Sequence, residues 1–253
     1  MILPATYQNG FAPRDGQPLY PSLWRGCVGA WNPGLGPSGL TLRDWSGFGN
    51  HGTLTNGPTF AASQGKYAMS FDGTDDYVET SMHIIPAGNA TISCWVYTRS
   101  TVEGYFLVEW STDNNMYVGV FSGNWIARTG DGGGGFSSLL STAATADKWT
   151  HLSASRTSST LTLYLNGAAM VSTSATSYQG GGIQPLRICR LGTSIYANCL
   201  ISDAMIHSRA LSPNEIRTLA TRRGIAYVMA PRRRSSAQVT TNRRRRIIIG
   251  GNR

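Results

Sequence analysis

The sequence is built from short β-prone segments separated by strong turn signals, and this pattern limits what the chain can fold into. Residues 160–165 (TLTLYL) are followed by Asn166-Gly167 and then by residues 169–173. Asn-Gly between two β-prone runs is the strongest short-range signal for a two-residue β-hairpin. Residues 90–98 (ATISCWVYT) alternate, with Ile92, Cys94, Val96 and Thr98 on one face. Both patterns predict strands of antiparallel sheets that bury one face.

The same reasoning extends along most of the chain. The other predicted strands are 67–71, 77–79, 105–110, 116–121, 149–156, 186–191 and 200–207. We expect 67–71 and 77–79 to form a hairpin through Asp72-Gly73, and we expect 105–110 to pair with 116–121 and 149–156 with 160–165. Charged residues are only 14% of the chain and glycines number 30, which favours turns over long amphipathic helices. The sequence therefore predicts an all-β protein, an antiparallel β-sandwich.

One short helix is predicted near the end of the patterned region. Ser212 is a suitable N-cap, Pro213 a suitable first residue, and Glu215 completes a capping box, with Gly224 expected to end the helix. Residues 1–25 contain four prolines and no sustained periodicity, which predicts an extended arm. We therefore divide the chain into a Pro-rich N-terminal arm (1–25), a β-sandwich domain (26–224) and an Arg-rich C-terminal tail (225–253).

Five segments in register resemble a known superfamily. They are 42–54 (LRDWSGFGNHGTL), 69–78 (MSFDGTDDYV), 149–152 (WTHL), 163–167 (LYLNG) and 201–212 (ISDAMIHSRALS). In this order and spacing they resemble the concanavalin A-like lectin/glucanase superfamily, in its laminin G-like branch, over about residues 26–221. The resemblance implies a jelly roll of two curved antiparallel sheets, with a concave face that often binds glycans.

The residues do not support hydrolysis. Glucanases of this superfamily place two or three carboxylates along one strand in a Glu-x-Asp-x-(x)-Glu pattern, where one acts as nucleophile and another as acid. The nearest approach here begins at Glu109 and lacks the second glutamate. The four histidines (His51, His83, His151 and His207) are scattered, and no GxSxG motif occurs. We therefore predict that the protein is not an enzyme and requires no cofactor.

Two kinds of binding residue are candidates. Trp110, Tyr117 and Trp125 lie near strand ends or beside glycine and asparagine, where a sugar-stacking platform can form; core packing or subunit contact is the alternative. The resemblance implies a calcium ion that often joins an early loop to the last strand, with Asp44 and Asp203 in the matching places. The alternative is that Asp44 forms an Asx turn and Asp203 caps backbone amides. Asp75 and Asp76 are interpreted as turn residues.

Cysteine usage indicates no zinc site, because no CxxC or paired-histidine spacing occurs. Cys189 and Cys199 flank a predicted turn, a placement in which two residues can face each other across strands. The first ten residues lack the cationic and apolar regions of a signal peptide, so reduced thiols are favoured over a disulfide. No run of about 18 apolar residues occurs, so no membrane partner is predicted.

The charge of the chain is concentrated at its C-terminal end. The formal net charge is +9, and residues 217–253 contain eleven arginines and no carboxylate. The runs Arg232, Arg233, Arg234 and Arg243, Arg244, Arg245, Arg246 lead into Ile247, Ile248 and Ile249, a β-prone triplet suited to adding a strand to a neighbouring subunit. Nonspecific binding of nucleic acid is the weaker alternative, since no aromatic residue interleaves the arginines.

The layout is similar to that of proteins encoded among tailed-phage structural genes. It implies a virion component assembled in the host cytoplasm: a lectin-like jelly roll that decorates the capsid and is anchored to capsid or neighbouring virion subunits by its arms. Such a protein is expected to be a homo-oligomer. The alternative is a carbohydrate-binding module that recognises cell-surface or polymeric glycans.

Overall fold

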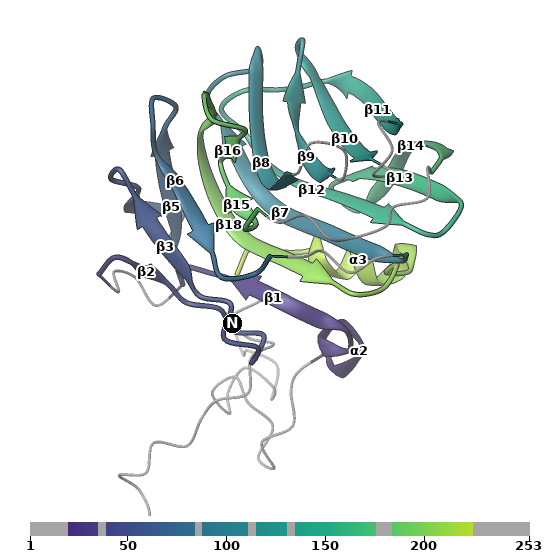
Figure 1. Ribbon diagram of the computed structural model, residues 1–253, viewed down its shortest axis with the longest axis horizontal. Coiled ribbons are helices and arrows are strands. Elements are labelled where there is room, and N and C mark those ends of the chain that lie inside the picture. The colour runs from purple at the N-terminus through teal and green to yellow at the C-terminus, as the bar shows by residue number, and fades with distance from the viewer. Residues whose placement is uncertain are drawn as a thin grey trace, which may run out of the picture.

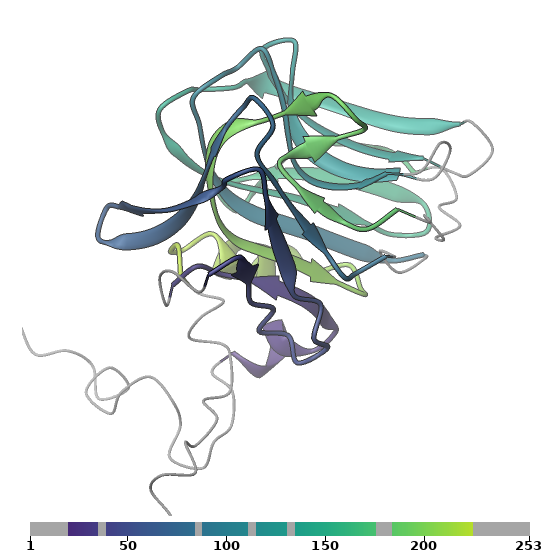
Figure 2. The same ribbon diagram turned by 60° about the vertical axis from the view of Figure 1, so that its left-hand side comes forward.

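The protein is an antiparallel β-sandwich in which two large sheets pack face to face (Figures 1 and 2). The computed structural model describes residues 20–34, 39–83, 88–110, 115–130, 135–175 and 184–224. Within these ranges there are two eight-stranded sheets, one two-stranded sheet and two short helices. The predicted all-β jelly-roll class with one short C-terminal helix is confirmed.

Sheet 1 and sheet 2 are defined by their strand order. Sheet 1 runs β14 (Ala168–Ser174), β13 (Thr160–Leu165), β12 (Trp149–Arg156), β7 (Ala90–Thr98), β18 (Asn198–His207), β5 (Lys66–Asp72), β4 (Thr59–Ser63), and β1 (Cys27–Trp31) also pairs with β18. Sheet 2 runs β11 (Phe136–Ala143), β10 (Asn124–Gly130), β9 (Asn115–Phe121), β8 (Glu103–Trp110), β15 (Arg187–Ile188), β6 (Tyr77–Thr80), β3 (Gly52–Thr55), β2 (Thr41–Leu42). The small sheet pairs β16 (Arg190–Leu191) with β17 (Ile195–Tyr196).

The core lies between the two sheets. Ile92, Cys94 and Val96 of β7 are fully buried there, as the alternation in the sequence predicts. They belong to the same cluster as Phe106 of β8 and Val118 of β9 on the facing sheet. Because removing apolar surface from water stabilises a fold by roughly 25 cal/mol per Å², this interior is the main source of stability.

Several predicted strand pairs are confirmed. β8 pairs with β9, β12 with β13, and β13 with β14. The last pair turns at Asn166 (φ 50°) and Gly167 (φ 83°), and positive φ at both central residues is what a type I′ hairpin requires. A side chain at Gly167 would place its Cβ 2.9 Å from the Arg217 Cα, so this turn also packs against α3 (Pro213–Leu219).

The hairpin predicted around Asp72-Gly73 is wrong. β5 belongs to sheet 1 and β6 to sheet 2, so the turn carries the chain from one sheet to the other. The turn itself is present: the Thr74 amide donates to Asp72 Oδ1 at 2.7 Å. Local turn chemistry identifies a reversal of the chain, whereas the partners of each strand are set by distant segments, β18 for β5 and β3 for β6.

The helices agree with the sequence in part. Ser212 caps α3, and both bonds of the predicted capping box form with Glu215. The helix ends at Leu219, earlier than the predicted Gly224, because Ala220 closes its last turn. A second helix, α2 (Pro21–Trp24), replaces the extended structure predicted for the end of the arm. Proline suits the first turn of a helix, and burial of Leu23 holds this turn against the domain; residues 1–19 lie outside the described part.

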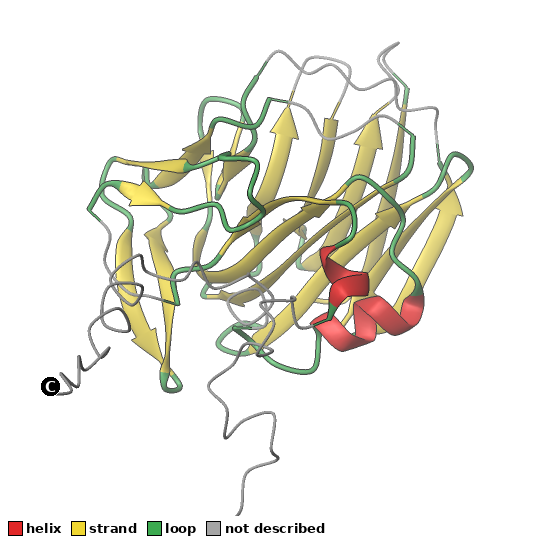
Figure 3. Cartoon of the chain, turned by 90° about the horizontal axis from the view of Figure 1, so that it is seen from below, coloured by secondary structure: helices red, strands yellow, loops and turns green. Residues whose placement is uncertain are grey.

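The helices cover the outer face of sheet 1, which Figure 3 shows with α3 lying across the strands. Leu211, Ile216 and Leu219 form a second apolar cluster with Met205 of β18 and Tyr164 of β13. Trp95 of β7 donates from Nε1 to the Leu219 carbonyl at 3.3 Å. The face of sheet 1 that points away from the core is therefore occupied by the protein itself.

Of the described residues, none lie in a helix long and apolar enough to cross a membrane.

Two buried histidines predict how stability depends on pH. Burial lowers the pKa of His207 from 6.5 to about 4 and that of His151 from 6.5 to about 3. The bond from His207 Nε2 to the Leu23 carbonyl at 2.8 Å raises the pKa, but the effect of burial is larger, so the neutral form is the one that the fold favours. Below pH 6.5 the unfolded chain binds protons that the folded chain does not, so the free energy of unfolding falls as pH drops, by about 1.4 kcal/mol per pH unit for each histidine.

Urea unfolding between pH 6.5 and 5 measures this slope. The His207→Gln variant should lose about half of it. The matched control His83→Gln removes an exposed histidine and should leave the slope as in the wild type. An unchanged slope in His207→Gln would contradict the assignment of a neutral buried imidazole.

The cysteine pair generates a second prediction. Cys189 Sγ and Cys199 Sγ lie 3.3 Å apart, as expected from their placement, and burial raises the pKa of Cys189. Exchange with glutathione disulfide should convert these two thiols into one disulfide and release two molecules of reduced glutathione, after local opening exposes the thiols. After oxidation, the protein is alkylated in denaturant and its intact mass is measured. Cys27 and Cys94 should be alkylated, whereas Cys189 and Cys199 should not react because they form the disulfide. Four alkylated cysteines after oxidation would contradict this.

Candidate functional site

Sheet 2 carries aromatic and cationic side chains on its outer face, the face that points away from the core. Tyr117 of β9 lies between Met116 and Val118, which are both fully buried in the core. Successive side chains of a strand point to opposite faces, so Tyr117 faces outward. It belongs to a separate cluster with Tyr105, Val108, Ile126 and Leu191.

Strand register sets the arrangement of this face. Tyr117 lies opposite Arg128 of β10, and Arg128 lies opposite Ser138 of β11. The rings of Tyr105 and Tyr117 meet edge to face, with centroids 5.0 Å apart and an interplanar angle of 78°. Gly119 makes room for this contact, because a Cβ there would lie 2.9 Å from Cδ1 of Tyr105.

Arg128 and Phe136 form the exposed part of the face. The Arg128 guanidinium lies 3.7 Å from the centroid of the Phe136 ring and 5.9 Å from that of Tyr117. Arg128 Nη1 donates to the Tyr117 hydroxyl at 3.3 Å. Phe136 is opposite Gly130, which has no side chain, and 54% of its surface is exposed. We call Tyr117, Arg128 and Phe136 the Arg128 stack.

The two tyrosines of the face are neutral. Burial raises the pKa of Tyr105, and its hydroxyl donates to Glu103 Oε1 at 2.9 Å, which raises the pKa further. Burial also raises the pKa of Tyr117. Both phenols therefore stay protonated at physiological pH, where they act in hydrogen bonding and packing.

A second arginine lies over aromatic rings on the other side of β8. The guanidinium of Arg190 in β16 is 4.5 Å from the Tyr77 ring centroid and 5.6 Å from that of Tyr196. Strand β16 lies beside β8 (Figure 1), where Leu191 joins the outer cluster. The neighbouring Arg187 is paired with Glu79 at 3.0 Å. Arg128 of β10 and Arg190 of β16 thus each lie on an aromatic ring, on opposite sides of β8.

The residues predicted to form a stacking platform are placed differently. Tyr117 and Trp125 are each only 3% exposed, so neither offers a free ring face for stacking. Trp125 packs in the core with its ring centroid 6.4 Å from that of Phe106, as the alternative predicted. Trp110 lies at the end of β8, and its side chain is outside the described part of the structure.

Phe136 was missed because it follows a glycine run and begins an edge strand without a clear hairpin signal. Burial alternates along the strand, with Ser137 and Leu139 buried and Ser138 and Leu140 exposed. The residues themselves (FSSLL) do not alternate between apolar and polar, so periodicity gave no signal for this strand.

Asp44 is an internal acceptor. Its Oδ1 accepts from the amides of Ala30 (2.9 Å) and Ser46 (2.8 Å), and its Oδ2 accepts from Ser46 Oγ (2.7 Å) and the Asn50 amide (2.9 Å). A carboxylate has about four lone-pair positions, so these bonds leave none for a cation. This is the Asx-turn alternative, extended to a whole loop.

Asp203 is also turned inward. Its Oδ1 accepts from Asn32 Nδ2 at 2.5 Å, and its Oδ2 accepts from Ser202 Oγ at 3.2 Å and from the Gly224 amide. The residue has φ 49° and is 3% exposed. Asp44 thus ties its loop to Ala30 of β1, and Asp203 ties Asn32 and Gly224 to β18. These engaged carboxylates do not fit the calcium site that the resemblance implied.

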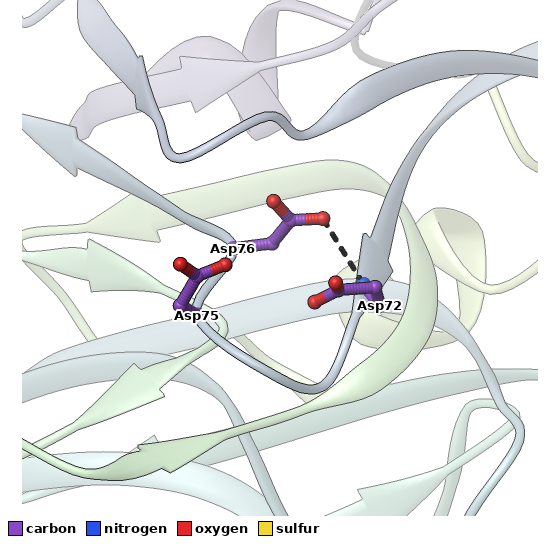
Figure 4. Close-up of side chains that lie close together, drawn as sticks. All are labelled: Asp72, Asp75 and Asp76. Carbon is purple, nitrogen blue, oxygen red and sulfur yellow. Dashed lines mark hydrogen bonds between the residues drawn. The ribbon is translucent and has the colours of Figure 1, made fainter.

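Three other carboxylates come together at the crossover from β5 to β6 (Figure 4). Asp72, Asp75 and Asp76 each place a carboxylate oxygen within 4.8 Å of the others. Asp76 Oδ2 accepts from the Asp72 amide at 3.1 Å, and burial raises the pKa of Asp76. Hydrogen bonds from the backbone, first from Thr74, lower the pKa of Asp72. These bonds are those of a turn, as predicted for Asp75 and Asp76.

Three of the four histidines have structural partners. His51 Nδ1 accepts from the Asp44 amide at 3.1 Å, His151 meets the ring of Trp95 edge to face, and His207 donates to the Leu23 carbonyl. Glu109 lies in β8, and its side chain is outside the described part.

The role of Asp44 can be tested by replacing it. Asp44→Asn removes two acceptors from a buried set of donors and should lower the free energy of unfolding by about 3 kcal/mol. The matched control Asp147→Asn, at an exposed position, should change it little. Melting temperatures measured in EDTA and in excess calcium should coincide for the wild type. A rise with calcium that Asp44→Asn abolishes would restore the metal site.

The chain is similar to known proteins in sequence pattern and in fold. A family model described as the concanavalin A-like lectin/glucanases superfamily matches residues 72–217. A search of curated protein sequences finds no match. Among solved structures, the chain is similar to the binding domain of Paraclostridial Mosquitocidal Protein 1, with a TM-score of 0.66, 15% identity, and coverage of 78% of this chain and 52% of that one.

Two similar structures were solved with a sugar bound. Domain 4 of AbnA, a GH43 extracellular arabinanase from Geobacillus stearothermophilus, in complex with arabinotriose, has a TM-score of 0.63 and 17% identity, and the match covers 77% of this chain and 98% of that domain. The botulinum neurotoxin serotype D ligand binding domain in complex with N-acetylneuraminic acid has a TM-score of 0.60 and 14% identity, with coverage of 79% and 52%.

The chain spans about half the length of the toxin domains that it matches. At these identities the similar structures show a shared fold. The family model matches more than half of the chain, and the β-sandwich agrees with it. The protein belongs to the concanavalin A-like lectin/glucanase superfamily.

Proposed function

We propose that the jelly-roll domain is a carbohydrate-binding module and that the Arg128 stack on the outer face of sheet 2 is its glycan-binding surface. The observation that carries this proposal is the half-exposed Phe136 ring, with a guanidinium on one side, on a sheet face that no helix covers. On sheet 1, α3 and α2 pack over part of the outer face, and the guanidinium that lies on the Trp149 ring belongs to the buried Arg223. Among the described residues, the Arg128 stack combines a guanidinium with a ring that is more than half exposed.

The chemistry of the stack suits a sugar. A pyranose or furanose ring has apolar C–H faces and a rim of hydroxyl groups, so it needs a flat apolar surface and nearby hydrogen-bond donors. Phe136 supplies the surface and Arg128 supplies donors in a fixed plane. Ser138, which lies opposite Arg128 and is exposed, adds a hydroxyl.

A binding role without catalysis is further supported by the neighbours. The similar structures are described as binding domains or as a domain holding arabinotriose. In the described part of sheet 2, Glu103 is held by Tyr105 and Glu79 by Arg187. Both are engaged in partner bonds, which fits a face that holds a ligand and leaves its glycosidic bonds intact.

The comparisons favour this alternative over virion decoration. None of the similar structures described above is a capsid component, and residues 225–253, which include the Arg runs and Ile247–Ile249 predicted as anchors, lie outside the described part. Attachment to a virion, homo-oligomerisation and binding of nucleic acid by the tail therefore stay predictions. Gradient co-sedimentation with particles, comparing the full chain with one ending at Gly224, tests the first of them.

Glycan binding can be tested by removing the exposed ring. The full chain should be retained by at least one glycan on a panel that includes arabinan and sialylated oligosaccharides. Phe136→Ala should weaken that binding about tenfold, because an aromatic contact of this kind is worth roughly 0.5–1.5 kcal/mol beyond its area. Isothermal titration calorimetry with the retained glycan measures the change.

The matched control is Phe48→Ala, which removes an even more exposed phenylalanine, 68% accessible, from a loop away from the stack. Its affinity should equal that of the wild type. Retention by no glycan, or equal affinity of Phe136→Ala and wild type, would overturn the proposal.

A further inference from the structure

Arg128 of sheet 2 and Arg190 of the small sheet form no ion pair with any carboxylate in the described part of the chain. Within the described residues the ion pairs join Arg187 to Glu79 and Arg209 to Glu215. Arg128 and Arg190 instead lie on aromatic rings, at 3.7 Å from Phe136 and 4.5 Å from Tyr77. The face therefore presents positive charge that no described carboxylate of the chain pairs with.

Glu103, a described carboxylate near the Arg128 stack, is engaged elsewhere. Glu103 accepts a hydrogen bond from the Tyr105 hydroxyl, and the distance between its oxygens and Arg128 does not reach that of an ion pair. It adds negative charge to the face and lowers its net potential, but no carboxylate in the described ranges forms an ion pair with the Arg128 guanidinium. Arg128 Nε is itself buried and makes no hydrogen bond within the described part.

Such an arginine is already prepared for a ligand. Contact with Phe136 and the bond to the Tyr117 hydroxyl hold the guanidinium plane in place, so little side-chain freedom remains to be lost on binding. A partly buried cation without a partner is unfavourable, and a carboxylate is the group that matches its paired N–H donors in geometry and charge. Neutral hydroxyl groups satisfy the donors but leave the charge uncompensated.

We infer that the glycan recognised by this face is acidic: the carboxylate of a uronic or sialic acid residue pairs with Arg128 while the sugar ring lies against Phe136. This inference rests on the proposed carbohydrate-binding function and names its ligand class. Arg190 in β16, which lies beside β8, adds to the positive charge on the far side of β8. The face is thus suited to an acidic polymer as well as to a terminal acidic sugar.

The test uses matched pairs of oligosaccharides that differ only at the carboxyl group. Each uronic or sialic acid is compared with its carboxyl-reduced form, in which a primary alcohol replaces the acid, at low and at high salt. The full-length wild type should bind the acid form at least about tenfold more tightly, because charge-assisted bonds are about twice as strong as neutral ones. The preference should shrink as ionic strength rises.

Variants separate the contribution of Arg128 from that of net charge. Arg128→Gln should bind acid and reduced forms equally, and Arg128→Lys should keep only part of the preference, because it retains the charge but loses the planar fork. Arg217→Gln removes one exposed charge from α3, on the other side of the molecule, and should keep the full preference. Melting temperatures confirm that each variant is folded.

The outcomes distinguish the two proposals. Equal binding of acid and reduced forms by the wild type, or an undiminished preference in Arg128→Gln, overturns the acidic specificity while leaving carbohydrate binding in place. Binding only to sulfated sugars shows an anion site but overturns the carboxylate assignment. Binding to no sugar on the panel overturns the carbohydrate function itself.

Discussion

The structure depends on the burial of one face of strand β7 against the opposite sheet. β7 pairs with β12 on one side and β18 on the other, so it has no free edge, and Ile92, Cys94 and Val96 are completely withdrawn from water. β12 and β18 then extend sheet 1 to both sides. Because these strands come from distant parts of the chain, the core forms only when the chain closes long loops, and its apolar area must outweigh that entropy.

The two outer faces of the sandwich have different roles because only one of them is covered. α3 and α2 bury the outer face of sheet 1, and Trp95 is bonded into that contact. On sheet 2 the small sheet β16–β17 covers part of β8 and leaves the Arg128 stack at the β10–β11 side. The proposed glycan site and its acidic specificity both follow from this difference.

Local signals predicted the local structure well. The Asn166-Gly167 turn, the Ser212–Glu215 capping box and the alternation of β7 are present as expected. The Asp72-Gly73 turn was also recognised, but its strands enter different sheets. The site was less predictable. Tyr117 was predicted as an exposed stacking ring but is buried beside Arg128, Trp125 is in the core, and the exposed Phe136 was not predicted. Exposure depends on what packs over each face, which the sequence pattern does not give.

The sequence by itself determined the fold class, the turns, the capped helix and the absence of a glucanase carboxylate pattern, since each follows from the order of neighbouring residues. The tertiary structure decided which strands pair. It also decided that the carboxylate oxygens of Asp44 and Asp203 accept hydrogen bonds from the protein's own groups, and that Arg128 lies on Phe136 without a described carboxylate partner. These facts depend on side chains that are brought together across strands and sheets. Spacing along the chain does not predict these contacts. Alternation along a strand gives the face on which a side chain lies, but the side chains that pack against that face come from other strands.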